Sequence, residues 1–434
     1  KNCEFKVEYA EKLKGWEIDG TIETAWKIIC TVDTLDELFN SDIVANVCPA
    51  PDTKLFPKGV DEEWIKPGKS TWNWWAKISW KYKEQLKLVD LGAQMGADYH
   101  LVDIGWDQKW IDGDKGPFEH LKMLCDYAAK KDIGIWVWKT SDVSLNIAMD
   151  KNPAKSKFNS LKEVNISLDV DKMRTEVKRI AAAGAKGIKL DYIQSENSKW
   201  KTYMVNFLKV CAENKLMVDF HGCPMPAGES RTYPNEVTRE AIYGGEKLRG
   251  GGGAVKMPTA AYIDLAFTRM LAGHADYTPG IFAAQQGKGF SDAMQLASAM
   301  ILTSPILCWA DHPKNYIASE GLDIIKTLPT IWDETKVLKG SVLSDLAVFA
   351  RRKGKDWYVA GINGFADKKQ SYDLDLSFLS SGKYKTTICK DRANGSRQIL
   401  AEDTTLTVSD KLKIDMLPSG GFIIRLSKID ADVK

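Results

Sequence analysis

Short apolar runs alternate with amphipathic segments from about residue 70 to residue 335. The short runs predict strands, and segments whose apolar residues recur every three or four positions predict helices. The predicted strands cover residues 71–75, 99–106, 134–139, 187–192, 216–223, 236–242, 275–277 and 306–310. The predicted helices cover residues 80–95, 116–131, 168–184, 198–214, 258–272 and 288–303. This alternation predicts an α/β fold, a (β/α)8 TIM barrel. A doubly wound open sheet is less favoured because no glycine-rich turn follows the first strand.

After about residue 340 the apolar positions recur every second residue, which is typical of strands with one buried face. The expected strands are 346–351, 356–363, 372–376, 383–390, 404–409 and 421–426. Turn signals such as Asn394-Gly395 separate them. This part of the chain predicts a C-terminal antiparallel β-sandwich.

Residues 1–68 differ from both of these parts. They contain two strand-like runs, 4–9 and 25–31, followed by a proline-rich stretch at 49–68. Two strands make a poor independent domain, so we interpret them as the tail of an N-terminal β-sandwich domain whose remainder is absent. The expected division is therefore 1–68 for this remnant and linker, 69–340 for a catalytic barrel, and 341–434 for the C-terminal sandwich.

Composition excludes several classes of function. The formal net charge is +2 and is spread along the chain, so nothing calls for nucleic acid as a partner. No apolar run reaches the roughly 18 residues that a membrane span needs. The eight cysteines are scattered without metal-ligand spacing and leave the redox compartment open. The chain starts with Lys1 rather than Met, so we expect a chain that is processed, tagged or cut from a longer protein.

Polar and aromatic side chains gather where the predicted strands end, and in a barrel these ends face the active site. They are Trp74, Asp103, Trp106, Trp138, Lys139, Lys189, Asp191, Asp219, His221, Asp276, Tyr277 and Asp311. Carboxylates accept hydrogen bonds from hydroxyl groups, and indole rings stack on sugar rings, so the set suits a polyhydroxylated substrate. A salt-bridged cap remains an alternative role for any single member.

Two pairs of charged residues suggest chemistry. Lys189 and Asp191 share a strand face, and the ammonium group would keep the carboxylate ionised, as a nucleophile requires. Glu240 and Glu246 flank Gly244 and Gly245, which would interrupt a helix, so we expect a loop. Two glutamates there could bind a hard cation such as Ca²⁺, or one could donate a proton. Solvated loop glutamates are the alternative.

Several ordered segments resemble glycoside hydrolase family 97. They are WIKPGKSTWNWW at 64–75, GIKLDY at 187–192, DFHG at 219–222, RTYPNEVTREAIYGGE at 231–246, ADYTPG at 275–280 and LPTIWDETKVL at 328–338. The resemblance implies an N-terminal β-supersandwich, a catalytic (β/α)8 barrel, a C-terminal β-domain and, in many members, dependence on calcium. It also implies activity on α-glucosides, α-galactosides or β-L-arabinopyranosides.

The resemblance also indicates a mechanism. Inverting members of the family have glycine where Asp191 stands and a glutamate directly after the histidine that matches His221, whereas this chain has Gly222 there. The chain therefore resembles the retaining branch. By that resemblance Asp191 is the nucleophile and Glu246 the acid/base, while Glu240 is a calcium ligand and Glu246 a second contact to the ion. The expected substrate-binding residues are Trp74, Asp103, Trp106, Lys189, His221 and Asp276.

The expected function is that of a retaining exo-glycosidase acting on terminal α-galactosides of oligosaccharides or other glycosides. A β-L-arabinopyranosidase or α-glucosidase with the same machinery is the close alternative. The other alternative is a sugar-binding remnant without turnover. In the family the N-terminal domain contributes a cation ligand and part of the pocket wall, and we expect most of that domain to be missing from this chain. We expect a periplasmic or extracellular location in a bacterium. The sequence does not indicate an oligomeric state.

Overall fold

A computed structural model describes residues 20–21, 27–111, 113–148, 150–162, 164–248, 257–283 and 289–429. Its centre is a parallel sheet of seven strands with the order β6-β5-β4-β3-β2-β1-β7. The strands are β1 (Gly68–Trp72), β2 (Tyr99–Val102), β3 (Gly134–Thr140), β4 (Gly187–Asp191), β5 (Met217–Phe220), β6 (Glu236–Arg239) and β7 (Ile306–Trp309). All are buried except at a few end positions, as expected for strands enclosed on both faces.

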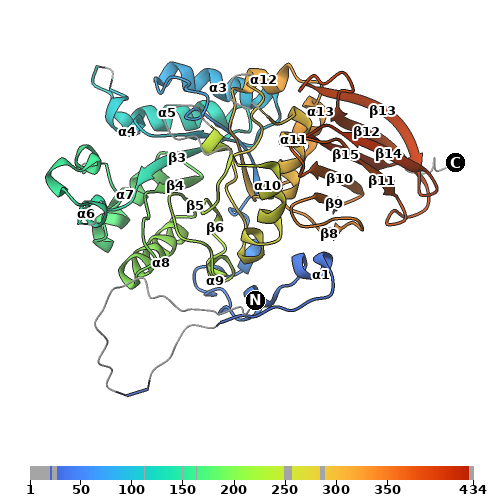
Figure 1. Ribbon diagram of the computed structural model, residues 1–434. Coiled ribbons are helices and arrows are strands. Elements are labelled where there is room, and N and C mark those ends of the chain that lie inside the picture. The colour runs from blue at the N-terminus through green and yellow to red at the C-terminus, as the bar shows by residue number, and fades with distance from the viewer. Residues whose placement is uncertain are drawn as a thin grey trace.

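Helices surround this sheet as in a TIM barrel (Figure 1). The principal ones are α3 (Tyr82–Gln94), α5 (Pro117–Ala129), α7 (Val170–Ala182), α8 (Ser198–Glu213), α10 (Thr259–Ala266) and α11 (Asp292–Ile301), each inside a predicted helix. Side-chain caps set several starts: Asp169 accepts from the backbone of Asp171 and Lys172 ahead of α7, and Asn197 accepts from Trp200 N ahead of α8. Shorter helices are α4 (Trp106–Lys109), α6 (Val143–Ala148), α9 (Glu229–Thr232), α12 (Pro313–Ile317) and α13 (Leu322–Thr327).

The predicted strand 275–277 is wrong. The segment lies between β6 and β7, because Asp276 N donates to Arg239 O (2.9 Å) and Ala310 N donates to Pro279 O (3.1 Å). It forms no ladder because Tyr277 N turns back to Ala275 O (2.9 Å) and Thr278 has φ +49°. The near-barrel therefore has seven strands, and an irregular segment takes the place of the eighth.

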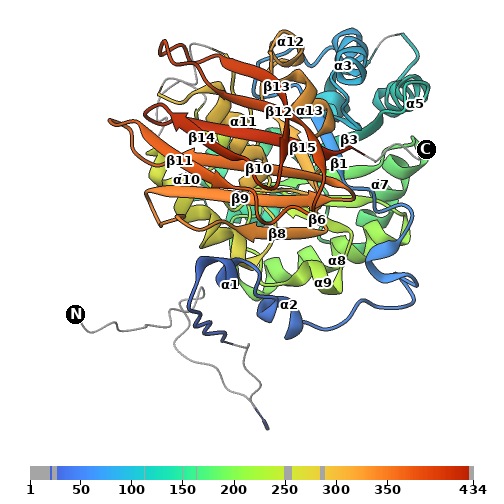
Figure 2. The same ribbon diagram turned by 90° about the vertical axis from the view of Figure 1, so that its right-hand side faces the viewer.

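The C-terminal part is antiparallel, as predicted. Six strands form one sheet with the order β13-β12-β15-β10-β9-β8, and β11 pairs with β14 in a second. Their bounds are β8 (Glu334–Val337), β9 (Leu346–Lys353), β10 (Asp356–Asn363), β11 (Gln370–Asp375), β12 (Lys383–Asp391), β13 (Ile399–Thr407), β14 (Lys411–Met416) and β15 (Gly421–Lys428). The sequence pattern missed β8 and β14. The sheets lie to one side of the barrel in Figure 1 and therefore face the viewer, in front of the barrel, in Figure 2. All ten residues of α11 are buried.

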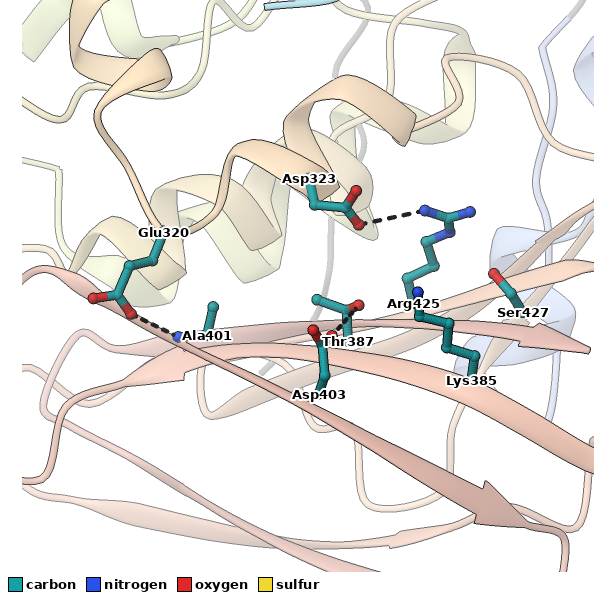
Figure 3. A pocket seen from close by; sticks show the side chains of 8 residues that line it. All are labelled: Glu320, Asp323, Lys385, Thr387, Ala401, Asp403, Arg425 and Ser427. Atoms are coloured by element: carbon teal, nitrogen blue, oxygen red, sulfur yellow. Dashed lines mark hydrogen bonds and ion pairs between the residues drawn. The ribbon is translucent and has the colours of Figure 1, made fainter.

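Other contacts join the parts of the chain. The edge strand β8 is covered by α1 (Leu35–Phe39), because Val337 N donates to Asp36 Oδ1 (2.6 Å). On another side, α13 faces the sheet across a polar hollow of about 380 Å³, where Asp323 pairs with Arg425 (3.4 Å; Figure 3). These charged contacts belong to the seam between barrel and sheet.

The N-terminal prediction fares less well. The run 4–9 lies outside the described residues, and the described part of 25–31 contains no strand. Two short helices, α1 and α2 (Ile43–Asn46), precede the barrel instead. The division of the chain at residues 68 and 340 stays a prediction. Within the described ranges, no helix combines the length and apolarity that a bilayer crossing requires.

Candidate active site

A pocket of about 240 Å³ opens where the barrel strands end. It is lined by Trp72, Trp74, Asp103, Ile104, Trp138, Lys189, Asp191, Tyr192, Gln194, His221, Gly222, Glu240, Glu246 and Lys247. Trp72 and Asp191 are the last residues of β1 and β4, and Asp103, His221 and Glu240 each directly follow a strand. The structure thus brings seven of the nine predicted site residues to one place.

Asp191 is fixed in orientation by two donors. Trp138 Nε1 donates to its Oδ2 (3.0 Å) and Tyr192 N donates to its Oδ1 (2.6 Å). Tyr192 adopts φ +67°, an uncommon value for a residue with a large side chain, directly after the strand. The strand end therefore turns sharply at the carboxylate.

Lys189 lies on the same face but forms its ion pair with another residue. Its Nζ is 3.6 Å from Asp103 Oδ2 and 4.1 Å from the centre of the Trp72 ring. Burial alone would lower the pKa of Lys189, but Asp103 and Glu246 raise it above its ordinary value. Trp72 Nε1 also donates to Asp103 Oδ2 (2.8 Å), so these three side chains form one charged and aromatic wall.

Glu246 reaches the pocket on a short 3-10 helix, η4 (Gly245–Leu248), which lies against the segment that closes the barrel. Gly245 N donates to Tyr277 O (2.8 Å), and a Cβ on Gly245 would stand 2.1 Å from Thr278 O, so only glycine allows this approach. Burial raises the pKa of Glu246. The positive charges of His221 and Lys189 lower this pKa, whereas the negative charges of Glu240 and Asp191 raise it, and the net shift is upward. An upward shift of the pKa favours the protonated form of the carboxyl group, which a general acid requires.

His221 connects the remaining carboxylates. Its Nε2 lies 2.9 Å from Asp276 Oδ2, while its Nδ1 lies 3.4 Å from Glu240 Oε2 and 3.8 Å from Glu246 Oε2. Burial alone would lower the pKa of His221, but Glu240 and Asp276 raise it well above its ordinary value. Glu240 Oε2 in turn accepts from Gly222 N (2.7 Å). The Nδ1 side of the imidazole therefore faces both glutamate carboxylates, and its Nε2 side faces Asp276.

Part of this cluster could hold a metal ion. The ligand atoms of His221, Glu240 and Glu246 all lie within 4.8 Å of one another. Ca²⁺ takes carboxylate oxygens, which the two glutamates supply, whereas imidazole suits transition metals better. The glutamates therefore fit a calcium ion, and His221 fits a supporting role beside them.

Two predicted substrate-binding residues lie elsewhere. Trp106 is fully buried, packs against Trp110 and Phe118, and donates through Nε1 to Trp138 O (2.9 Å), so it belongs to the core behind the pocket. It begins α4 instead of ending a strand. Asp276 is 2% exposed and reaches the pocket only through His221. Neither residue lines the pocket.

Seven lining residues were not among the predicted site residues: Trp72, Ile104, Trp138, Tyr192, Gln194, Gly222 and Lys247. Of these, Trp138 was a strand-end candidate to which no role was given. For Trp138 a signal existed, since it ends the same predicted strand as Lys139. Successive strand residues face opposite sides, so only one of the two could face the pocket. The structure has Trp138 inside, while Lys139 Nζ pairs with Asp107 (3.0 Å) and Glu176 (2.9 Å).

Comparison with known families gives two matches. The family model described as glycoside hydrolase 97 matches residues 64–242, and the one described as glycosyl-hydrolase 97 C-terminal, oligomerisation, matches residues 331–427. Together these ranges cover more than half of the chain. The first range contains Asp191, His221 and Glu240.

Relatives agree with these matches. A retaining alpha-galactosidase of Bacteroides thetaiotaomicron is 28% identical over 450 residues, which cover 94% of this chain and 61% of that protein. A probable retaining alpha-galactosidase of Streptomyces bingchenggensis is 28% identical over 93% of this chain and 58% of that protein. A family 97 enzyme of Pseudoalteromonas sp. strain K8, solved with acarbose, has a TM-score of 0.73 and 26% identity, covering 91% of this chain and 64% of that one. The chain spans about three fifths of the length of the curated relatives it matches.

Proposed function

The chain belongs to glycoside hydrolase family 97, and we propose that it is a retaining exo-glycosidase acting on terminal α-galactosides. The curated relatives carry that activity in their names, which supports the choice of sugar. The activity of the whole protein is proposed here, because this chain spans about three fifths of those relatives.

One observation carries the proposed mechanism. A Cβ placed on Gly222 would stand 3.0 Å from Asp191 Oδ1, so a side chain at position 222 would crowd the carboxylate. The inverting enzymes that the sequence resembles carry a base at position 222 and glycine at position 191. This chain has the reverse pair, which leaves Asp191 as the carboxylate at the reacting carbon and supports retention.

The reaction then follows in two steps. An oxygen of Asp191 attacks the anomeric carbon while the bond to the leaving oxygen breaks, and Glu246 gives its proton to that oxygen. Water then attacks the glycosyl-aspartate, Glu246 takes a proton from it, and Asp191 is released. The hydrogen bonds from Trp138 and Tyr192 orient Asp191 for attack. The upward shift in the pKa of Glu246 favours its protonated form, which the first step uses.

Glu240 and Glu246 would hold the calcium ion that many members of the family need. When bound, Ca²⁺ would supply positive charge that orders oxygen ligands around it. His221 contributes separately, because its Nδ1 faces both glutamates while Asp276 fixes its other nitrogen. The proposed cofactor is therefore held by the same segment that carries the acid.

The pocket supports attack at the end of a glycan. A volume of about 240 Å³ suits one sugar ring, which favours removal of a single terminal unit. Trp74 lines the pocket and would stack on the ring, while Asp103 and Lys189 would bind its hydroxyls. These contacts also suit an L-arabinopyranoside, which is the galactoside ring without its hydroxymethyl group, or an α-glucoside.

Location and assembly complete the proposal. We propose a periplasmic or extracellular enzyme in a bacterium, as expected for hydrolysis of external glycans. The description of the C-terminal family that matches residues 331–427 includes oligomerisation, which supports self-association through the C-terminal sheets.

Hydrolysis of nitrophenyl glycosides tests the proposal. The α-galactoside should be cleaved faster than the β-L-arabinopyranoside and the α-glucoside, and Asp191→Asn should abolish cleavage of all three. Galactose binding by calorimetry without cleavage of any of them, with or without Ca²⁺, would instead indicate a sugar-binding remnant.

A further inference from the structure

Arg269 is a buried cation whose bonds all go to the backbone. It begins the 3-10 helix η5 (Arg269–Ala272) and is 3% exposed. Its guanidinium donates to the carbonyl oxygens of Ala241 (2.8 Å), Gly273 (2.9 Å), Arg239 (3.3 Å), Glu240 (3.0 Å) and His274 (2.9 Å). It forms no ion pair with a described carboxylate. A buried charge without a counter-ion is costly, so five carbonyl partners indicate a specific purpose.

These carbonyls come from the two segments that build the cation and acid part of the site. Residues 239–241 run across the end of β6 and present Glu240 to the pocket. Residues 273 and 274 precede Asp276, the partner of His221. One side chain therefore holds the backbone that carries Glu240 beside the backbone that carries Asp276.

The backbone at the end of β6 is strained, which explains why it needs holding. Ala241 adopts φ +39°, a value that residues with a side chain rarely take. Such a conformation persists only where the surroundings impose it, and Arg269 Nε binds the carbonyl of this residue. The same turn leads the chain from Glu240 towards η4, which carries Glu246.

We propose that Arg269 is a positioning residue of the hydrolytic site, holding the 239–241 turn so that Glu240 and Glu246 meet His221. The inference rests on the proposed function and deepens it. Burial lowers the pKa of Arg269 only to about 10, so the side chain stays a cation at neutral pH. Because Arg269 does not line the sugar pocket, its loss should affect turnover more than substrate binding.

A matched pair of variants tests this role. Arg269→Met removes the side chain that binds these carbonyls, and Arg351→Met removes a similarly buried arginine of β9 that donates to Ile301 O (3.2 Å) and does not line the pocket. With a nitrophenyl α-galactoside, Arg269→Met should lower kcat by about 10²-fold and leave KM within about threefold, because misplaced catalytic groups slow the chemical step. Arg351→Met should keep kcat within about twofold even where both variants lose similar thermal stability. Equal kcat losses in the two variants would overturn the proposal.

Hydrogen exchange gives a readout that does not depend on activity. Amides of residues 239–246 should exchange faster in Arg269→Met than in the wild-type protein or Arg351→Met, and unchanged exchange would contradict the role. If the wild-type chain hydrolyses no glycoside, the proposed function fails while this comparison still decides the role of Arg269. If Arg269→Met does not fold, Arg269→Lys, which keeps the charge but offers fewer donors, should show smaller changes in the same direction. Wild-type exchange in Arg269→Lys would overturn the proposal.

Discussion

Asp191 Oδ1 lies 3.0 Å from the position that a Cβ on Gly222 would take, a tighter contact than Cβ atoms normally make. Gly222 has φ +49°, and its amide donates to Glu240 Oε2 (2.7 Å). The nucleophile proposed here and the absence of a side chain at position 222 are thus two consequences of one geometry.

A side chain at position 222 should harm both stability and turnover. Gly222→Ala places Cβ at a left-handed backbone position, which costs about 1–2 kcal/mol, and crowds Asp191. We expect a lower midpoint of thermal unfolding and a lower kcat. If Gly222→Ala matches the wild-type protein in both, the contact with Asp191 has no consequence.

Replacing the two positions together should be less harmful than the single changes suggest. Asp191→Gly frees the space that Gly222→Glu needs, so the double variant should be more stable than the sum of the single variants predicts. A thermodynamic cycle of the four proteins measures this coupling. Strict additivity would mean that the two positions are independent.

Removal of the nucleophile should be severe and chemically rescuable. Asp191→Asn should lower kcat by on the order of 10⁴ or more, as expected for loss of a covalent catalyst. In Asp191→Gly, which removes the side chain altogether, azide should restore cleavage of an activated α-galactoside and give the β-galactosyl azide, because it enters the space that the carboxylate occupied. Formation of the α-azide would contradict the assignment.

The pH profile should report Glu246. Burial raises the pKa of Glu246. The carboxyl group is protonated below this pKa and loses its proton above it. The activity that depends on the acid is therefore present at lower pH and is lost as pH rises through a pKa above 4.5. Measured kcat/KM should fall on that alkaline side, and Glu246→Gln should lower it by about 10²–10⁴ and remove the limb. An unchanged alkaline limb in Glu246→Gln would assign it to another group.

Calcium should stabilise the protein through Glu240. A ligand present at 100 times its Kd adds about 2.7 kcal/mol to the free energy of unfolding, so Ca²⁺ should raise the unfolding midpoint and a chelator should reverse this. Glu240→Gln should abolish the response. Glu84→Gln is a suitable control, because Glu84 pairs with Lys87 (2.7 Å) on α3, outside the pocket. An equal calcium response in Glu240→Gln would place the ion elsewhere.

The barrel could be predicted because its strands are apolar runs and its helices have regular amphipathic spacing. Where prediction failed, local patterns were overruled by tertiary contacts. The segment around Asp276 has strand-like composition and lies beside β6, but the turn at Thr278 prevents a ladder. In β14 only Leu412, Ile414 and Met416 are apolar, and this alternation is too short to predict a strand. The strand is evident only from its pairing with β11.

The site could be predicted less completely. The ends of the predicted strands indicate which residues are candidates, but they do not indicate where each side chain points. Asp191 and Glu246 both line one pocket, as the sequence suggested, and their roles stay predictions. Lys189 lies on β4 and its partner Asp103 follows β2, and β3 separates these two strands in the sheet. No local sequence pattern encodes such a pairing. Trp106 was misplaced for the same reason, since its helix begins where a strand was expected to end.

The most direct test is the anomer that the enzyme releases first. Proton NMR spectra recorded in the first minutes of hydrolysis of an α-galactoside distinguish α-galactose from β-galactose before they interconvert. Attack by Asp191 followed by attack of water predicts α-galactose as the initial product. Initial release of β-galactose would contradict the central claim, because it requires direct displacement by water without the glycosyl-aspartate.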